Sequence, residues 1–324
     1  MPVPRSAPCA PHMLESLISI VAPLEGVPPN AVEAFIEETA AELRRLVSHH
    51  EIILVDDGVS AETVARVRAL LERYDFLRFL RLSRHFGEET AIAAGLEAAI
   101  GDYMIVMLPN MDPPALIPEF LERARDDADI VYGVRLHRKN EPLWYRLGAR
   151  AFYWYINSVV KAGIPEDSTQ FRCMTRQVVN AITQIKDPDQ YLRLLTSYVG
   201  FRKQAFAYSP IDRSGAATVR PKGEALNLAR ALVMDHTTHP LRSVIWSGVL
   251  IALVNMVIVL ARGPASSARF QTALAFMVLS FMVALVGEYV GGLSRRLRDR
   301  PAYYVREEHT SSVLLKEDRK NVVA

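Results

Sequence analysis

The feature that most constrains this chain is an alternation, between residues 17 and 135, of short apolar runs with longer amphipathic segments. The amphipathic segments, such as residues 28–47, carry apolar side chains at helical spacing. Strands that alternate with helices predict an α/β fold whose sheet is mostly parallel, with the helices as crossover connections. The expected strands are residues 17–24, 50–58, 77–83, 102–108 and 128–135.

Ligands of such sheets bind beyond the carboxyl ends of the strands. The candidate positions are therefore Pro23–Glu25, Asp56–Gly58, His85–Glu88, Asn110–Asp112 and Gly133–Arg135. The acid pair Asp56–Asp57 has two interpretations, a nucleotide contact or a plain turn, because Asp and Gly also favour turns. His85 follows a strand in the expected pocket, where a ligand contact and a structural role are equally compatible with the sequence.

Two apolar blocks in the C-terminal third indicate a membrane hairpin. Half of the residues are hydrophobic although 23% are charged, yet residues 243–261 and 270–287 contain no charged side chain. Each block is close to the roughly 20 residues that a helix needs to cross the hydrocarbon core. Buried core helices are the alternative interpretation. Arginines are frequent in residues 294–300, so the positive-inside rule predicts that the N-terminal domain and the C-terminal tail are both cytoplasmic.

These patterns divide the chain into five expected segments. They are a disordered leader (1–14), a cytoplasmic domain (15–222), an interfacial juxtamembrane helix (223–240), a transmembrane hairpin (241–293) and a cytoplasmic tail (294–324). Prolines stand in the leader where a signal peptide would need an apolar run. Cys9 and Cys173 fit no metal-binding spacing and are expected to stay reduced. The net charge of +2 says little, because the basic excess is local, and no nucleic-acid partner is expected.

Several stretches resemble one family when they are taken in order. They are "EIILVDDG", "LSRHFGEETAIAAGLEAAIGDYMIVM", "DPPALIPEFL", "DIVYGVR", "IPEDSTQFRCM", "VGFRK", "PLR" and "GEYVGG…RPAYYV". Together they resemble the family 2 glycosyltransferases that load a sugar onto a polyprenyl phosphate, a group that includes dolichol-phosphate mannose synthase and bacterial undecaprenyl-phosphate glycosyltransferases. The resemblance runs from about Leu17 to Val305. It implies a GT-A-like sheet, a nucleotide-sugar donor, a polyprenyl-phosphate acceptor, and Mg2+ or Mn2+ as cofactor.

The resemblance also implies roles for individual residues. Those expected at the nucleotide are Pro23, Leu24, Glu25, Asp56 and Asp57, with His85 added from its place at a strand end. Asn110 and Asp112 stand where the family has its metal site, and the catalytic set would be Asp112, Arg135, Gln170 and Arg172. The residues expected at the lipid phosphate are Arg176, Arg213, Arg220 and Lys222. Arginine suits these phosphate positions because its guanidinium fork pairs with two oxygens.

The sequence departs from the family pattern at four ligand-facing points. The usual "DADLQDPPE" is "LPNM-DPPA" here, so no Asp-x-Asp is present. The usual "NFGKE" is "HFGEE", which puts Glu88 in place of a lysine, and "DSGDFR" is "DSTQFR", which puts Gln170 in place of an acid. The basic "GxSKY" segment is "GAATV". The donor site is therefore modified.

Transfer to a lipid phosphate remains compatible with these changes. The lipid phosphate is largely ionised at neutral pH and needs no strong base. Magnesium is often held by only one or two carboxylates, so Asp112 and the Asn110 carbonyl oxygen meet the minimum. The leading hypothesis is a working membrane-bound glycosyltransferase. The alternative is a catalytically impaired relative that acts as a binding or assembly subunit, and a transporter fits poorly because two helices enclose no pathway. A homo-oligomer or a membrane-protein partner is compatible with either of the first two.

Overall fold

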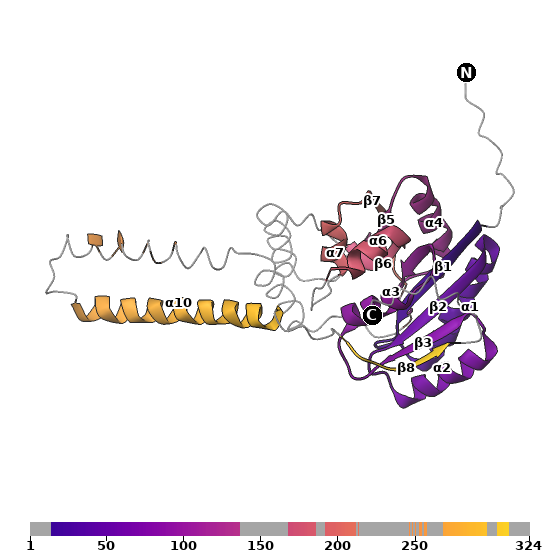
Figure 1. The fold of residues 1–324 in the computed structure, drawn as a ribbon, viewed down its shortest axis with the longest axis horizontal. Helices are drawn as coiled ribbons and strands as arrows, with labels where there is room; N and C mark the ends of the chain where they lie inside the picture. The colour runs from indigo at the N-terminus through magenta and orange to yellow at the C-terminus, as the bar shows by residue number, and fades with distance from the viewer. Residues whose placement is uncertain are drawn as a thin grey trace, which may run out of the picture. The chain divides into compact units, whose positions relative to one another are not determined.

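The computed structural model describes residues 14–136, 168–185, 192–211, 213, 268–296 and 303–310, with a few residues between 246 and 257. The chain forms two compact units, which are described separately. The first contains a sheet with its helices, and the second contains α10 (Ala268–Arg296) (Figure 1). The expected interfacial helix, nearly all of the leader, and Arg220 and Lys222 lie outside the described residues.

The first unit has the α/β alternation that the sequence predicts. Its strands are β1 (Leu14–Pro23), β2 (Val47–Asp56), β3 (Leu77–Leu82), β4 (Tyr103–Val106), β5 (Ile130–Arg135), β6 (Ser168–Thr175), β7 (Lys203–Tyr208) and β8 (Val305–Thr310). Its helices are α1 (Pro29–Leu46), α2 (Ala61–Arg73), α3 (Glu88–Ala98), α4 (Ile117–Asp126), α6 (Arg176–Thr183) and α7 (Leu192–Tyr198), and the short η1 (Pro114–Leu116) precedes α4.

The described strands form one eight-stranded sheet in the order β7-β5-β6-β4-β1-β2-β3-β8. The pairs β1–β2, β2–β3, β1–β4 and β5–β7 are parallel, whereas β6 and β8 are antiparallel to their neighbours. The predicted α/β class and mostly parallel sheet are confirmed. Since the chain runs from β1 through β2 to β3 and then returns to β4 on the other side of β1, the strand order reverses between β1 and β4. Ligand crevices of open α/β sheets lie at such a reversal.

Helices cover both faces of this sheet, and each face has its own core. On one face, Phe35 of α1, Val64 of α2 and Phe120 of α4 pack on the strands. On the other face, Ile92 of α3 and Val178 of α6 pack there together with residues of α7. Local signals set the helix starts: a proline occupies the first turn of α1, and the Ser60 hydroxyl accepts a hydrogen bond from the Thr63 amide at the start of α2.

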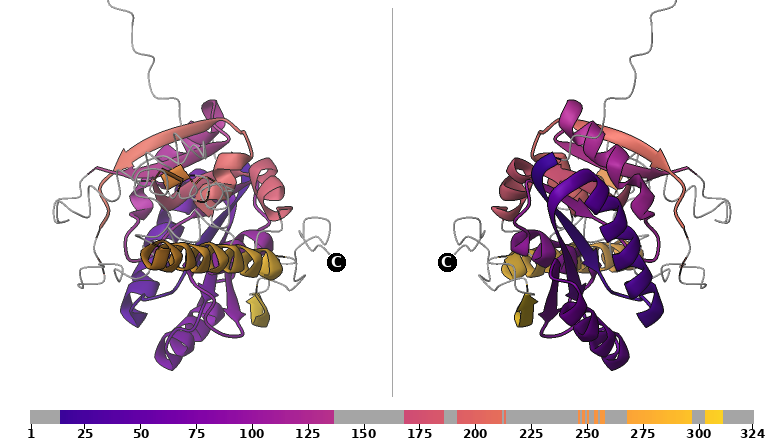
Figure 2. Two further views of the ribbon diagram at one scale, coloured as in Figure 1. Left: turned by 90° about the vertical axis from the view of Figure 1, so that its left-hand side faces the viewer. Right: turned by 90° about the vertical axis from the view of Figure 1, so that its right-hand side faces the viewer.

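The C-terminal strand β8 differs from the sequence expectation, which treats residues 294–324 only as a charged tail. β8 pairs antiparallel with β3, from Arg78 opposite Thr310 to Leu82 opposite Val305. Figures 1 and 2 show this yellow strand beside the strands of the N-terminal half. Most of its side chains are exposed, and Arg306, Glu307 and Glu308 are charged, as is usual for an edge strand that must avoid pairing with other chains. The sheet is therefore completed by residues from beyond α10.

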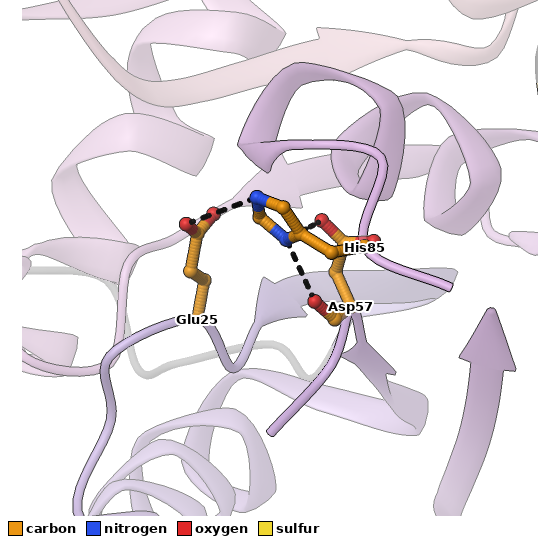
Figure 3. Close-up of side chains that lie close together, drawn as sticks. All are labelled: Glu25, Asp57 and His85. Carbon is orange, nitrogen blue, oxygen red and sulfur yellow. Dashed lines mark hydrogen bonds and ion pairs between the residues drawn. The ribbon is translucent and has the colours of Figure 1, made fainter. Parts of the chain in front are cut away.

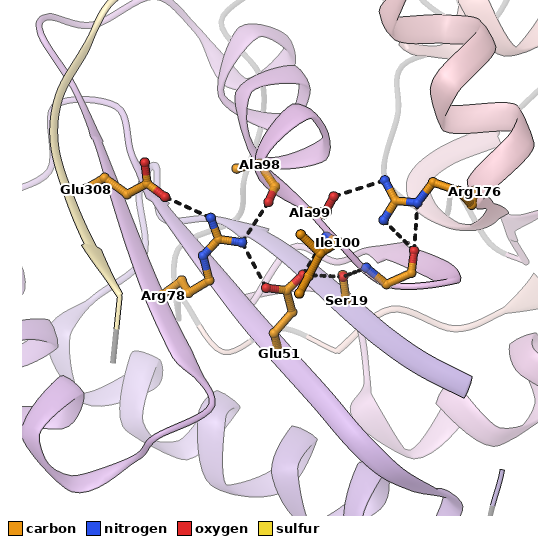
Figure 4. A network of polar contacts seen from close by, with 9 residues as sticks. Ser19, Glu51, Arg78, Ala98, Ala99, Ile100, Arg176 and Glu308 are labelled. Carbon is orange, nitrogen blue, oxygen red and sulfur yellow. Dashed lines mark hydrogen bonds and ion pairs between the residues drawn. The ribbon is translucent and has the colours of Figure 1, made fainter. Parts of the chain in front are cut away.

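A buried polar network connects β8 to the middle of the sheet (Figure 4). The Arg78 guanidinium donates to Glu51 at 2.9 Å, to the Ala98 carbonyl at 2.7 Å and to Glu308 of β8 at 2.8 Å. Glu51 in turn accepts from the Ser19 hydroxyl at 2.5 Å and from the Ile100 amide at 2.8 Å. The network therefore ties the turn between α3 and β4, together with β8, to the sheet.

The second unit is described mainly by α10, which includes the predicted apolar block 270–287. Large apolar side chains of this helix are exposed; Phe276 is 68% exposed and Phe281 63%. Across the residues that the structure describes, no helix combines the length and the apolarity required of a membrane span. Most of the other predicted block, 243–261, is outside those residues.

Candidate functional site

Three predicted site residues meet where β1, β2 and β3 end at the carboxyl edge of the sheet. Glu25 follows β1, Asp57 follows β2 and His85 lies between β3 and α3. The His85 Nδ1 atom lies 2.9 Å from the Asp57 main-chain oxygen and 3.0 Å from its Oδ2 atom, and Nε2 lies 3.9 Å from Glu25 Oε1. Figure 3 shows the imidazole between the two carboxylates. The parallel sheet has therefore brought together three loops that are distant in sequence.

Hydrogen bonds from main-chain amides determine how these loops fold. Asp57 is 2% exposed, and its carboxylate accepts from the Phe86 amide at 2.7 Å and from the Gly87 amide at 2.6 Å. Gly87 has a φ of 105°, a conformation that favours glycine. Asp57 thus joins the loop after β2 to the loop after β3. This role leaves little of the carboxylate for the direct nucleotide contact that the sequence suggests.

The preceding acid, Asp56, has a structural role as well. It is fully buried, its Oδ1 atom accepts from the amides of Gly58 and Val59, and its Oδ2 atom lies 3.0 Å from Arg81 Nε. The turn interpretation of "VDDG" fits this residue. Both of its oxygens already have partners inside the protein, so the expected contact to a nucleotide stays a prediction.

The side chains of this cluster that a ligand can reach are those of Glu25 and His85, which are 45% and 62% exposed. The hydrogen bond between the ring and the Asp57 carbonyl is the largest cause that raises the pKa of His85. Burial opposes it, and the charges of Asp57 and Glu25 raise the pKa further. The imidazole is thus held in one orientation, with its Nε2 edge towards Glu25. A ligand at this edge would meet one carboxylate and one imidazole nitrogen.

At the end of β4, the structure shows how Asp112 of the expected metal site is held. Asp112 is 1% exposed, its Oδ2 atom accepts from the Leu108 amide at 2.8 Å, and its Oδ1 atom accepts from the Tyr208 hydroxyl at 2.5 Å. Burial raises the pKa of this carboxyl to about 6. Asp112 therefore points into the protein and closes its own loop, and its carboxylate is already used in internal contacts.

The buried carboxyl should make stability depend on pH. Because its pKa is raised above that of the unfolded chain, Asp112 favours the folded state at low pH, and this contribution is lost as the pH rises through about 6. The free energy of unfolding of the unsubstituted protein should fall between about pH 4 and about pH 7, whereas that of Asp112→Asn lacks this change. The difference between the two proteins should therefore shift by about 3 kcal/mol in favour of the variant over this range. Urea unfolding at a series of pH values measures this difference. A difference that stays constant with pH contradicts the assignment.

The predicted catalytic residues on β5 and β6 are not grouped around His85. Gln170 is 1% exposed and donates to Glu89 of α3, while Arg172 is 2% exposed and donates to the Thr169 carbonyl and the Thr196 hydroxyl. Arg135 is partly buried, with one guanidinium nitrogen 3.6 Å from the Met111 sulfur. Of these three, Arg135 alone retains partial exposure, so the expected role of Arg172 at a phosphate does not fit its burial.

The remaining predicted residues are separated by the fold. Arg176 begins α6 at the amino end of β4, away from the carboxyl ends of the parallel strands, and donates to the carbonyls of Gly101 and Ala99. Arg213 donates to Glu38 of α1. Leu24 is fully buried and belongs to the core, and Pro23 ends β1. Arg213 remains beside the loop after β4, because its amide donates to the Asn110 carbonyl at 3.1 Å.

Sequence reasoning missed two polar residues of this edge, Tyr208 and Glu89. Tyr208 ends β7, and "KQAFAY" shows the alternation typical of a strand. Its pairing with Asp112, however, spans almost a hundred residues and has no local signal. The sequence around Glu89 predicts only a helix, whereas in the structure the Glu89 carboxylate accepts hydrogen bonds from Gln170 and from the Leu192 amide.

A second group of possible metal ligands is the cluster of Glu25, Asp57 and His85. One ligand atom from each of these residues lies within 4.8 Å of the other two. Imidazole nitrogen and carboxylate oxygen are donors that Mn2+ and Zn2+ accept. The His85 ring is also oriented by a hydrogen bond at its other nitrogen, as is usual for a metal-binding histidine. Glu25 and His85 expose donor atoms to a divalent cation. The carboxylates of Asp57 and Asp112 are both buried and already accept hydrogen bonds.

Comparison with known proteins places this geometry in a family context. The model of the family described as Glycosyl transferase family 2 matches residues 29–183. The uncharacterized glycosyltransferase YkcC of Bacillus subtilis is 28% identical over 300 residues, covering 87% of this chain and 93% of that protein. The bactoprenol glucosyl transferase of Shigella phage SfII is 26% identical and covers 90% and 98%. The undecaprenyl-phosphate 4-deoxy-4-formamido-L-arabinose transferase of Serratia proteamaculans is 26% identical and covers 90% and 93%.

Among solved structures, a similar chain is glucosyl-3-phosphoglycerate synthase from Mycobacterium tuberculosis, in complex with Mn2+, uridine-diphosphate-glucose and phosphoglyceric acid. It is 16% identical, with a TM-score of 0.45, and the match covers 68% of this chain and 78% of that one.

Proposed function

The chain belongs to glycosyl transferase family 2, and we propose that it transfers a sugar from a nucleotide-sugar donor to a polyprenyl phosphate. The observation that carries this proposal is the extent of the similarity. Relatives named for transfer to bactoprenol and to undecaprenyl phosphate match 90% of this chain, which includes the apolar C-terminal part. A relative that shared only the sheet would support a sugar donor but no lipid acceptor.

The carboxyl edge of the sheet supports the donor half of this reaction. Glu25 and His85 expose polar atoms beside the reversal of strand order at β1 and β4, where ligands of such sheets bind. In the transfer, an oxygen of the lipid phosphate forms a bond to the anomeric carbon, while the bond from that carbon to the diphosphate breaks and the nucleoside diphosphate leaves. The phosphate is already ionised, so a neutral Gln170 and a buried Asp112 are compatible with the reaction.

The direct test is sugar transfer by the full-length protein in detergent, with a polyprenyl phosphate and a panel of uridine- and guanosine-diphosphate sugars. Binding of the same donors, measured by calorimetry, separates a failure of donor binding from a failure of the acceptor. Lipid-linked sugar formed from at least one donor is the expected result. Donor binding without any transfer to polyprenyl phosphate contradicts the proposed acceptor.

We propose further that a divalent cation binds at Glu25, Asp57 and His85, where it would neutralise charge on the leaving diphosphate. Electron paramagnetic resonance of free Mn2+ measures this binding directly. The unsubstituted protein should bind Mn2+, and His85→Ala should weaken binding about tenfold or more, because an imidazole ligand is lost. Asp112→Asn is the matched control and should bind as the unsubstituted protein does. The opposite pattern would return the cation to the end of β4.

For localisation we propose attachment to the membrane through the second unit, with both chain ends on the cytoplasmic side. The exposed apolar side chains of α10 support attachment, since soluble surfaces rarely expose so many together. The pairing of β8 with β3 supports a location of the N-terminal and C-terminal ends on the same side of the membrane. Strands from before and after α10 belong to a single sheet. Protease protection in inside-out vesicles tests this: a tag after residue 324 that is protected while the N-terminal domain is digested contradicts it.

A second function, that of a non-catalytic binding or assembly subunit, is favoured by one specific observation. The acids Asp56, Asp57 and Asp112, all expected at ligands, use their carboxylates for internal contacts. A protein that has lost its reaction can keep such acids for folding alone. A stable complex with another membrane protein, formed by a chain that binds no sugar nucleotide, is the result that would support this function.

A further inference from the structure

The loop after β4, residues 108–112, is joined to the chain at and after the end of β7 by three hydrogen bonds. The Tyr208 hydroxyl donates to Asp112 at 2.5 Å, the Ile211 amide donates to the Met111 carbonyl at 2.9 Å, and the Arg213 amide donates to the Asn110 carbonyl at 3.1 Å. Two of these bonds use main-chain atoms that any sequence would supply. The bond from Tyr208 is the one that a specific side chain provides.

The position of the Tyr208 hydroxyl is fixed by its surroundings. The residue is 3% exposed, and its ring lies edge-on to Phe171 with 5.4 Å between the ring centroids. A Cβ atom on Gly133 would lie 2.6 Å from the Tyr208 ring and 2.9 Å from the Thr169 hydroxyl, so the absence of a side chain there makes room for both. Tyr208 Oη also lies 3.2 Å from Thr169 Oγ1. The ring cannot turn away without unpacking this side of the sheet.

Charges around Asp112 make the contact with Tyr208 more important than an ordinary hydrogen bond. From β5, Arg135 attracts the buried carboxylate, whereas from α3 Glu88 repels it. The Leu108 amide holds one oxygen, and Tyr208 holds the other. A hydrogen bond to a charged, buried acceptor contributes more than one between neutral groups, because the alternative is a desolvated charge without a donor.

We propose that Tyr208 is a positioning residue, which through Asp112 holds the loop of residues 108–112 as one wall of the donor site. The loop follows β4 at the β1–β4 reversal, and the loop that carries Glu25 follows the neighbouring parallel strand β1. In this chain a buried hydrogen bond thus holds the loop at the place where the family resemblance led us to expect a metal ion. The effect on transfer rests on the proposed function, whereas the effect on the loop itself does not.

Amide hydrogen exchange of the full-length protein tests the effect on the loop. Tyr208→Phe removes only the hydroxyl, and we expect the amides of Leu108, Ile211 and Arg213 to exchange about tenfold faster or more. Asp112→Ala, which removes the acceptor of the Tyr208 hydroxyl, should accelerate the same amides, and the double variant should add little to either single change, because both single changes break the same contact. The amides of Gly58 and Val59, which Asp56 holds, should not change.

Tyr74→Phe is the matched control, since the Tyr74 hydroxyl contacts the exposed Glu37 on α1, outside the donor site. It should leave the exchange of the loop unchanged. Unchanged exchange in Tyr208→Phe, or faster exchange spread evenly over the domain, overturns the proposal.

Kinetics then connect the loop to transfer. In Tyr208→Phe we expect the KM for the sugar nucleotide to rise about tenfold while the KM for polyprenyl phosphate stays the same, because only the donor wall is loosened. A general loss of folded protein would lower the apparent kcat and leave both KM values unchanged, which contradicts a positioning role. If the unsubstituted protein binds no sugar nucleotide while the loop exchange responds as described, the proposed function fails and the contact between Tyr208 and the loop stands.

Discussion

Replacing Arg78 with methionine should lower the free energy of unfolding by about 3 to 5 kcal/mol, because it leaves the charge of Glu51 buried without its partner. The two side chains are 9% and 7% exposed and 2.9 Å apart. Methionine keeps most of the volume of the arginine stem, so the loss reflects charge and hydrogen bonding more than packing. Urea unfolding of the full-length protein in detergent, followed by tryptophan fluorescence and by circular dichroism, measures the change.

The double variant Arg78→Met with Glu51→Gln separates the ion pair from its surroundings. Removal of both charges of a buried pair is often nearly neutral, so this variant should regain part of the loss. Arg68→Met is the matched control, because Arg68 pairs at 2.7 Å with Glu307 on the same strand β8, but half of its side chain is exposed. It should leave unfolding nearly unchanged. Equal effects of the Arg68 and Arg78 substitutions would contradict the importance of the buried network.

The same network explains why β8 could not be predicted. "VREEHT" carries four charged or ionisable side chains in six residues and has no apolar alternation, so it reads as a solvated tail. It is a strand because Glu308 reaches the buried Arg78 and because β3 offers a free edge. Both conditions depend on the three-dimensional arrangement. By contrast, the first five strands follow from local apolar runs, and the structure has all of them within a few residues of the predicted ranges.

The site shows the same division between local and long-range information. That Glu25, Asp57 and His85 converge follows from topology alone, since parallel strands present their carboxyl ends at one edge. The direction of each side chain does not follow, because it depends on which amides the folded loops leave without a partner. Asp57 turns towards the amides of Phe86 and Gly87, and Asp112 turns towards Leu108.

The arginines of "FRCMTR" were misjudged for a related reason. The resemblance implies phosphate contacts for both, but Arg172 lies buried in β6 and Arg176 begins α6. The polar residues of β6 are buried by partners from other elements, such as Glu89 for Gln170 and Thr196 for Arg172. A strand with polar side chains in the core has no apolar alternation by which it could be recognised.

Asp57→Ala should have the second large effect, on folding and on donor binding together. The substitution leaves the amides of Phe86 and Gly87 without their acceptor and removes the contact to the His85 ring. An amide left unsatisfied in a part-buried position costs about 1 to 3 kcal/mol, so the expected loss of stability is about 2 to 4 kcal/mol. The loop that carries His85 then loses its fixed position, and the affinity for a sugar nucleotide should fall about tenfold or more.

Comparison with His85→Ala distinguishes a structural role of Asp57 from a direct contact with the ligand. His85 is largely exposed, so its removal should weaken donor and Mn2+ binding while the free energy of unfolding changes little. For Asp57→Ala, urea unfolding and calorimetric binding should both change, because one carboxylate fixes two loops. If Asp57→Ala loses donor affinity with unchanged stability, the carboxylate contacts the nucleotide itself, as the sequence had suggested. The hydrogen bonds to Phe86 and Gly87 would then be replaced when the donor binds, and the donor site would form only around its ligand.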